Sequence, residues 1–167
     1  MKLSDREWGE FEVGKLFNVY RTPFFEKRID NDGKIPYISA SKINNGYNFF
    51  VKDNFEKSIF AQNHITVEKI NLQAFYQPSK FLCSHDVNCL ELKNMKMNKN
   101  IGLFLVNSFR KQMEKYNYGY ICSASRMKKQ KFLLPVDTEG NPDYDFMEEY
   151  TKSIIDKKLE DYKKYAK

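Results

Sequence analysis

Three segments of the sequence combine basic side chains, amide side chains and aromatic rings. They are residues 20–28 (YRTPFFEKR), 39–47 (SASKINNGY) and 116–131 (YNYGYICSASRMKKQK). Lys and hydroxyl groups can hold phosphates, whereas Asn, Gln and Arg can make paired hydrogen bonds to base edges. The segments therefore contain the residue types that recognition of duplex DNA needs. Polar loops are also common as plain solvated surface, so none of the three is specific by itself.

Charge is distributed unevenly along the 167 residues. Residues 1–136 carry 22 Lys or Arg and 13 Asp or Glu, a net charge of +9, whereas residues 137–167 carry 6 and 9, a net charge of −3. A basic body favours an anionic partner, and nucleic acid is the commonest one. A solvated Lys-rich surface is the alternative, because the total of +6 is modest.

The sequence patterns of common active sites are missing. There is no Walker loop, GxGxxG, HExxH or GxSxG pattern, and no methyltransferase signature of a Gly-rich loop with an Asn-Pro-Pro-aromatic motif. The two histidines, His64 and His85, read as structural or incidental. A nuclease of the Pro-Asp…Glu-x-Lys type would need its acidic residues on a pair of strands. The acidic residues that could serve, Asp143, Glu148 and Glu149, instead fall on a predicted helix. We therefore predict no catalytic residue.

The three cysteines do not form a standard site either. Cys83, His85 and Cys89 could supply metal ligands, but their spacing fits no common zinc finger. An odd number of cysteines without a CxxC pair, the third being Cys122, also argues against a disulfide framework. We predict buried thiols and no metal. No stretch is apolar enough for a membrane helix or a signal core, so a soluble, cytoplasmic protein is the expectation.

The first 95 residues read as short strands joined by turns. Alternation of apolar and polar residues, or short apolar runs, predict strands at residues 8–17, 35–38, 59–67, 74–77 and 86–92. The dipeptide Asn45-Gly46 is the strongest hairpin signal in the chain. From residue 100 to residue 116, apolar residues recur every three or four positions, which predicts an amphipathic helix. A polar stretch, residues 123–130, then leads to a last strand at residues 131–136.

The C-terminal residues predict a second helix over residues 143–165, with Asp143 at its N-terminus. Its apolar stripe includes Ile155, Leu159 and Tyr162 and steps by threes and fours, as in a coiled coil. The stripe could pack on a partner or fold back on the body, and we favour the partner. The predicted fold is α+β: a mostly antiparallel β domain with a packed helix over residues 1–140, followed by a C-terminal helix, residues 141–167, for dimerisation.

Several blocks resemble one known family. They are EWGEFEVGKLF, IPYISASKINNG, AFYQPSKF, DVNCLEL and RMKKQKFLLPVDTEGNPDYDFMEEY, and the likeness runs from about residue 8 to residue 150. These blocks are similar to the target-recognition domain of type I restriction-modification specificity subunits and of the related type IIB specificity subunits. A full subunit of that family resembles two such domains, each followed by a long helix. This chain has one of each and so resembles a half-subunit.

The resemblance implies a non-catalytic protein that directs a partner methyltransferase to a two-part DNA site. S-adenosylmethionine would be bound by the methyltransferase and no cofactor by this chain, and a nuclease or translocase subunit could join the complex. A half-subunit can pair with a copy of itself through its helix and then read a palindromic site. The alternatives are a small DNA-acting enzyme, either a nuclease or a fragment of a fused modification enzyme, and an interaction protein with an incidental basic surface.

Residues in the three segments are our candidates for DNA contact. They are Arg21, Lys42, Asn44, Asn45, Tyr118, Arg126, Lys128 and Lys129. The candidates for dimer contact are Ile155, Leu159 and Tyr162 on the C-terminal helix.

Overall fold

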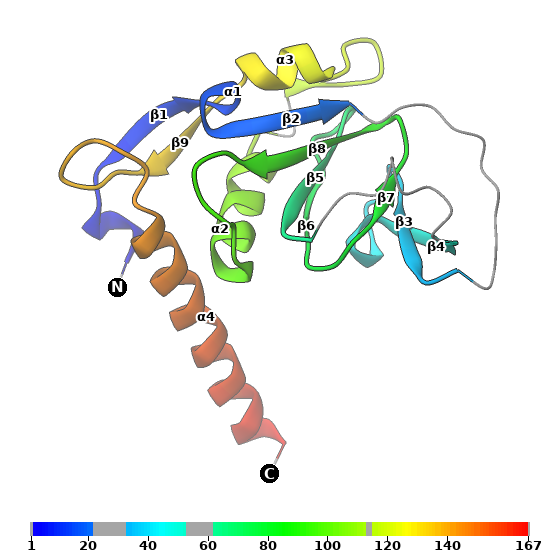
Figure 1. Cartoon of the computed structure of the whole chain (residues 1–167). Coiled ribbons are helices and arrows are strands. Elements are labelled where there is room, and N and C mark those ends of the chain that lie inside the picture. Colours follow the sequence, from blue (N-terminus) through cyan, green and yellow to red (C-terminus); the bar gives the residue numbers. More distant parts are fainter. Residues whose placement is uncertain (1, 22–32, 53–61, 113–114, 167) are drawn as a thin grey trace.

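The computed structural model describes residues 2–21, 33–52, 62–112 and 115–166, whose arrangement is shown in Figure 1. In these ranges the strands are β1 (Trp8–Glu12), β2 (Phe17–Arg21), β3 (Ile35–Ile38), β4 (Tyr47–Val51), β5 (His64–Glu68), β6 (Ala74–Gln77), β7 (Leu82–Cys83), β8 (Val87–Leu92) and β9 (Lys131–Pro135). The helices are α1 (Val13–Leu16), α2 (Lys99–Arg110), α3 (Ala124–Lys129) and α4 (Tyr144–Tyr165), with short 3₁₀ turns η1 (Leu3–Asp5) and η2 (Asn44–Gly46). The predicted α+β class is confirmed.

A four-stranded antiparallel sheet in the order β2-β8-β5-β6 forms the centre of the fold. Side chains alternate between its two faces, and one face is apolar. That face and the inner side of α2 share one core cluster, which includes Phe17, Val19, Ile65, Val67, Leu90, Ile101, Leu105 and Phe109. Helix α2 lies close to β6 because residue 102 is glycine: a Cβ there would stand 2.3 Å from the ring of Tyr76.

A smaller sheet in the order β4-β3-β7 contacts the opposite face of the central sheet. Strand β3 pairs antiparallel with β4 and parallel with β7. A second buried cluster joins the two sheets through Ile38, Phe81, Cys83, Val87 and Cys89. The turn between β3 and β4 is η2, where Asn45 takes the left-handed conformation with φ of 56°. The hairpin that Asn45-Gly46 predicts is therefore confirmed.

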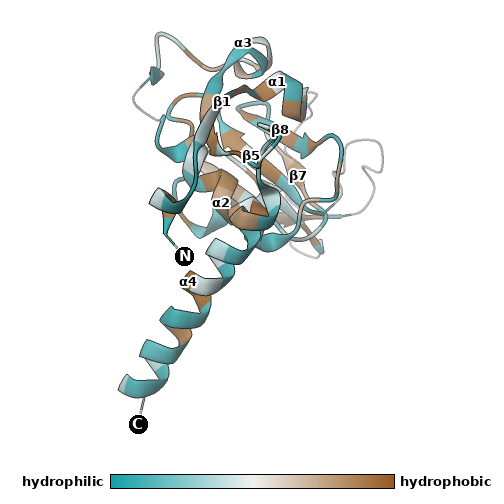
Figure 2. Ribbon diagram, turned by 90° about the vertical axis from the view of Figure 1, so that its left-hand side faces the viewer, coloured by the Kyte–Doolittle hydropathy of each residue, from teal (hydrophilic) through white to brown (hydrophobic). Residues whose placement is uncertain are grey.

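Strands β1 and β9 pair antiparallel and bring residues from the two ends of the chain together. Helix α4 follows β9 after a turn, and the Asp143 side chain caps its N-terminus by accepting from Phe146 N at 2.9 Å. Phe146 and Met147 are buried, and Tyr150 meets the ring of Phe104 on α2 edge to face. The rest of α4 projects away from the body (Figures 1 and 2). Among the described residues, no helix is long and apolar enough to cross a membrane.

The prediction of a continuous strand over residues 8–17 was wrong. The helical turn α1 separates β1 from β2 there, because tertiary contacts override the alternating pattern. Val13 is buried and its backbone N–H donates to the Gln130 carbonyl at 2.8 Å, while Gly14 lies against Lys128 of α3. Val13 and Phe17, four residues apart, both enter the core. Buried residues spaced four apart are typical of a helix, whereas alternation of apolar and polar residues is typical of a strand. Residues 8–17 contain both patterns.

Two further boundaries differ from the sequence prediction. Helix α2 ends at Arg110 rather than near residue 116, and the chain turns so that the Tyr116 hydroxyl can donate to Gln130 Oε1 at 2.8 Å. Residues 123–130, which we read as a polar connection, contain helix α3. Ser123 caps α3, and Met127 anchors it in the core. A single buried residue in a basic stretch gives too little periodicity to predict a helix.

The remaining strand predictions agree with the structure at their centres. Strands β3, β6, β8 and β9 lie where they are predicted, and β5 covers the described part of residues 59–67. Residues 59–61 lie outside the described residues.

Candidate nucleic-acid interface

Helix α3 presents two lysines on a rigid base. Lys128 and Lys129 are exposed, whereas Met127 between them and Arg126 is fully buried. Because the helix is short, its position depends on contacts at both ends. The Ser123 hydroxyl accepts from Arg126 N, and Val13 of α1 bonds to the carbonyl of Gln130. Two cationic side chains therefore stand next to each other on a backbone that is held in place, an arrangement that suits phosphate groups.

Arg126 belongs to a stack of flat side chains beside α3. Its guanidinium lies 4.1 Å from the ring centroid of Tyr120, and that ring stacks on Tyr116 with centroids 5.6 Å apart. Its Nη1 donates to the Ile121 carbonyl at 2.7 Å. Arginine has five N–H donors, so the guanidinium retains donors for a phosphate or a base edge. Arg126 is exposed and already oriented, which lowers the entropic cost of binding.

Tyr118 lies at the tip of the same segment. Its side chain is 87% exposed. The residues on either side of it close a tight turn, in which the backbone N–H of Gly119 donates to the side-chain oxygen of Asn117. An exposed aromatic ring next to cationic groups can stack on a sugar or a base. We name the exposed residues Tyr118, Tyr120, Arg126, Lys128 and Lys129 the α3 ridge.

The base of the ridge is joined to the central sheet. The Cys122 backbone N–H donates to the Lys69 carbonyl at 2.6 Å, and the Asn88 side chain donates to the Cys122 carbonyl at 2.9 Å. Asn88 pairs with Arg21, the last residue of β2. The structure thus brings the backbone of Arg21 to the same end of the sheet as the ridge. Residues 22–28, the rest of that predicted segment, lie outside the described residues, as does the side chain of Arg21.

Two more lysines lie close to α3 that sequence reasoning did not select. Lys15 is exposed on α1, and Lys93 follows β8 and donates from its Nζ to the Gly14 carbonyl. Gly14 also lies against Lys128. These residues are far apart in the sequence, and only the packing of α1 between β8 and α3 groups them. Figure 1 shows that α1, which carries Lys15, lies beside α3.

The turn at residues 39–46 forms a second, separate group. Lys42 and Asn44 are exposed at its tip. Asn45 has an internal role: its Nδ2 donates to the Tyr76 carbonyl at 3.0 Å and to Gln77 Oε1 at 3.1 Å. Gln77 Nε2 in return donates to the Asn45 carbonyl at 3.0 Å. The amide hydrogens of Asn45 are thus occupied in fixing the turn, whereas the side chains of Lys42 and Asn44 are exposed.

The structure does not bring the two groups together at one point. Cys122, at the base of the ridge, is bonded at Lys69, just after the C-terminal end of β5, whereas Asn45 is bonded at Gln77, which pairs with His64 at the start of β5. These two anchor points therefore lie at opposite ends of one strand.

One carboxylate on β8 has a fixed setting. Glu91 accepts hydrogen bonds from the Tyr20 hydroxyl and from Asn18 Nδ2. The bond from Tyr20 is the main reason why the pKa of Glu91 is lowered, and the same bond raises the pKa of Tyr20. Glu91 thus stays ionised and oriented beside β2. Sequence reasoning missed it, because a single Glu in an alternating strand reads as a solvated residue.

The residues considered as catalytic or metal-binding have ordinary settings. His64 is buried on β5 with its Nδ1 3.1 Å from the Gln62 carbonyl, and His85 is exposed beside Asp86. The three cysteines are buried, which confirms that prediction. In the part of the chain that the structure describes, no group of three or more His, Cys, Asp or Glu is placed to hold a metal ion.

The predicted dimer residues lie on the projecting part of α4. Ile155 is half-buried at the edge of the body, whereas Leu159 is 52% and Tyr162 71% exposed. Fold-back and partner binding therefore apply to different parts of one helix: the first turns pack on α2, and the later turns leave their apolar stripe in solvent. A helix that exposes such a stripe is typical of an interaction surface.

Comparison with known proteins places this fold in a family. Residues 5–162 match the type I restriction modification DNA specificity domain. Over 158 residues the chain is 35% identical to the specificity subunit S.BcgI of a type II restriction enzyme from Heyndrickxia coagulans, covering 93% of this chain and 46% of that subunit. The chain therefore belongs to the type I restriction modification DNA specificity domain family, and it spans about half the length of this curated relative.

Solved structures agree on the fold. The S subunit of a type I restriction-modification system from M. genitalium superposes with a TM-score of 0.63 at 17% identity, over 98% of this chain and 42% of that one. The HsdS subunit from Thermoanaerobacter tengcongensis gives a TM-score of 0.64 at 8% identity, over 90% and 38%. Each solved subunit is thus more than twice as long as the matched region.

Proposed function

We propose that this chain recognises a specific sequence in double-stranded DNA as a specificity subunit of a restriction-modification system. The observation that carries the proposal is the α3 ridge, an oriented group of cations and aromatic rings on a chain of this family. In the proposed complex the ridge and its neighbouring lysines hold phosphates, and exposed side chains such as Asn44 and Arg126 read base edges. The candidate residues Arg21, Lys42, Tyr118, Lys128 and Lys129 complete the contact surface.

The proposed partner is a methyltransferase that carries S-adenosylmethionine, while this chain binds no cofactor and contributes no catalytic group. A nuclease or translocase subunit would join the same complex and would be directed to the DNA sequence that this chain recognises. The membership of the family favours this role over that of a small nuclease or a fragment of a fused modification enzyme. Since the proposed substrate is cellular DNA, the proposed site of action is the cytoplasm.

A methylation assay tests this function directly. Transfer of a labelled methyl group to a mixed pool of duplexes is measured for a methyltransferase subunit of the same restriction-modification system, with and without the chain. We expect methylation of one sequence class only when the chain is present. Equal methylation with and without the chain would contradict the proposal that the chain directs the methyltransferase to a specific sequence. Cleavage or methylation by the chain alone would instead support the enzyme alternative.

We further propose that two copies pair through α4. The exposed stripe of Ile155, Leu159 and Tyr162 supports this, because large apolar side chains in solvent favour association. A two-fold pair would present two recognition domains, which matches the two-part palindromic site expected for a half-subunit. Replacing Ile155 and Leu159 by Asp is expected to give a folded monomer in sedimentation. A monomeric wild-type protein at micromolar concentration would contradict the pairing.

A further inference from the structure

Ile43 stands at the tip of the turn between β3 and β4 with its side chain in solvent. It is 68% exposed, the highest value for any large aliphatic residue in the part of the chain that the structure describes. Single apolar residues are common on protein surfaces and need no explanation by themselves. Ile43 differs from an incidental case in how its backbone is held and in which residues flank it.

The backbone of Ile43 is bonded at each of its polar groups. Its N–H donates to the Ser41 hydroxyl at 3.3 Å, and its carbonyl accepts from the same hydroxyl at 3.2 Å and from Gly46 N at 3.0 Å. The turn is in turn anchored to the body, because Asn45 donates to a carbonyl of β6 and Ser39 N donates to the Gly46 carbonyl at 2.9 Å. The fold therefore fixes the position of residue 43.

The turn also lies close against the small sheet. Gly46 has a φ of 76°, which glycine adopts without strain, and a Cβ there would stand 2.9 Å from Ile38 of β3. The side chain of Ile43 adds little freedom of its own, because a residue that is branched at Cβ has few rotamers. A stiff aliphatic group is thus presented to solvent at a defined place.

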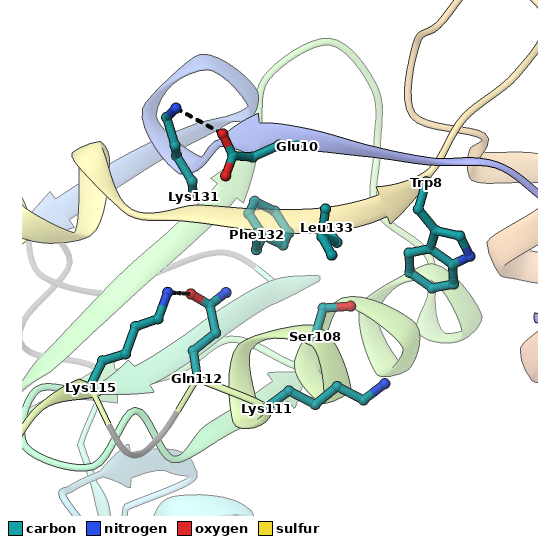
Figure 3. A pocket seen from close by; sticks show the side chains of 9 residues that line it. All are labelled: Trp8, Glu10, Ser108, Lys111, Gln112, Lys115, Lys131, Phe132 and Leu133. Carbon is teal, nitrogen blue, oxygen red and sulfur yellow. Dashed lines mark hydrogen bonds and ion pairs between the residues drawn. The ribbon is translucent and has the colours of Figure 1, made fainter.

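The side chain of Ile43 contributes little to the fold. It is neither in the three buried clusters of the described residues nor among the half-buried residues that pack against them. Leu133, which is 57% exposed, has a different setting: it lies in a pocket of about 550 Å³ between β9 and α2, together with Trp8 and Phe132, as Figure 3 shows. Leu133 thus shares its surface with other apolar side chains, whereas Ile43 does not pack on an apolar cluster.

The neighbours of Ile43 favour contact with a nucleic acid. Lys42 and Asn44 are exposed on either side of it. A lysine can hold a phosphate, and an asparagine can make two hydrogen bonds to the edge of adenine. For an aliphatic side chain between such groups, the major groove offers one apolar target, the 5-methyl group of thymine. Because adenine pairs with thymine, Asn44 and Ile43 both suit A·T pairs.

We propose that Ile43 is a specificity-determining residue that contacts the 5-methyl group of a thymine, next to the base edge that Asn44 reads. The inference rests on the recognition of double-stranded DNA proposed above, and it adds the chemical identity of one base that this turn selects. Burial of one methyl group corresponds to about a fourfold change in affinity. That factor is the expected size of the contact.

Replacement of thymine by uracil tests the contact with the wild-type protein, because uracil pairs with adenine in the same way and lacks only the methyl group. The binding motif is first recovered from a random duplex library in the presence of the methyltransferase subunit of the same system. Each thymine of the motif is then replaced singly in a labelled duplex. We expect at least one fixed A·T pair in the motif, and uracil at one thymine position should raise the Kd about fourfold. A motif without a fixed A·T pair, or a Kd that no uracil changes, would refute the contact.

Ile43→Ala shows whether Ile43 is the residue that senses the methyl group. Because the side chain is exposed and lies outside the core, the variant should keep the wild-type melting curve. It should bind the thymine and uracil duplexes equally, since the methyl group has lost its partner. Leu133→Ala shortens an exposed aliphatic side chain on β9 and is the matched control, which should keep the fourfold difference. A fourfold difference that persists in Ile43→Ala would assign the thymine to another residue and overturn the proposal.

The outcomes separate this inference from the proposed function. Loss of affinity for Ile43→Ala on every sequence, with no response to uracil, would make Ile43 a contact of another kind, such as a wedge between bases. The reading of thymine would then be wrong, while the recovered motif would still support recognition of a specific sequence. Recovery of no motif would contradict the proposed function itself, and this inference would fail with it.

Discussion

Removal of the two lysines of the α3 ridge is the most quantitative test of the proposed DNA interface. Lys128 and Lys129 are exposed, and Met127 holds the helix in place independently of them. Alanine at both positions should therefore change the free energy of unfolding by less than about 0.5 kcal/mol. Binding to DNA should change far more, because each lysine that neutralises a phosphate releases condensed counterions.

The expected size follows from counterion release. Each phosphate contact contributes about 0.9 to the slope of log K against log salt concentration, so loss of both contacts lowers the slope by about 1.8. With equal affinity extrapolated to 1 M salt, the double variant binds about 60-fold more weakly at 0.1 M and about 20-fold more weakly at 0.2 M. Fluorescence anisotropy of a labelled duplex over this range of salt measures both quantities.

A charge-matched control decides whether the effect is local. Lys157→Ala with Lys164→Ala removes the same charge from exposed positions of α4, away from the ridge. It should leave the slope within error of wild type. If the Lys128 and Lys129 variant also keeps the wild-type slope, or if both double variants lower it equally, the ridge does not hold phosphates and the reasoning is wrong.

Four further variants test other parts of the structure. Asn44→Ala should weaken binding by about 1–3 kcal/mol on the cognate site alone, whereas Asn45→Ala should destabilise the fold by about 1–2 kcal/mol in denaturant melts, because it removes the two amide bonds that fix the turn. Tyr20→Phe removes a donor to Glu91, whose pKa is lowered in the folded state. The variant should therefore be less stable than wild type at pH 7, and this difference should shrink as the pH falls below the ordinary Glu pKa of about 4.3 and through the lowered pKa of Glu91. Gly102→Ala should destabilise the fold by about 1–3 kcal/mol, since the methyl group would meet a β6 ring at 2.3 Å.

Each of these variants has an outcome that would contradict its basis. Equal losses for Asn44→Ala on all DNA sequences would make it a backbone contact, and an unchanged melt for Asn45→Ala would deny its internal role. A stability difference for Tyr20→Phe that does not shrink as the pH falls through the acidic range would show that the bond to the carboxylate is not its source. A wild-type melting curve for Gly102→Ala would mean that α2 can move away from β6.

Local signals predicted much of the fold. The Asn45-Gly46 turn, the alternating residues of β8 and the cap at Asp143 act within a few residues, and the structure has all three where the sequence places them. The failures occur where distant residues decide. Helix α1 exists because Val13 bonds to Gln130, and α3 because Met127 reaches the core. Neither contact can be read from a local pattern.

The residue types of the candidate interface could be predicted from the sequence, but the contacts between its residues could not. The segment of residues 116–131 does form an exposed group of cations and aromatic rings, since its residue types favour solvent. The sequence could not predict that the Asn45 amide would donate to β6, or that Gly14 of α1 would lie against Lys128 and accept a hydrogen bond from Lys93. Both depend on which surfaces pack together, and a linear pattern does not contain that information.

Selection of bound sequences from a random duplex library, with the methyltransferase subunit of the same system present, tests the central claim most directly. Sequence-specific recognition predicts enrichment of a motif, and pairing through α4 predicts that the motif has two palindromic halves at a fixed gap. Enrichment of no motif, together with binding that is lost by about 0.2 M salt, would leave only a basic surface and contradict the proposed function.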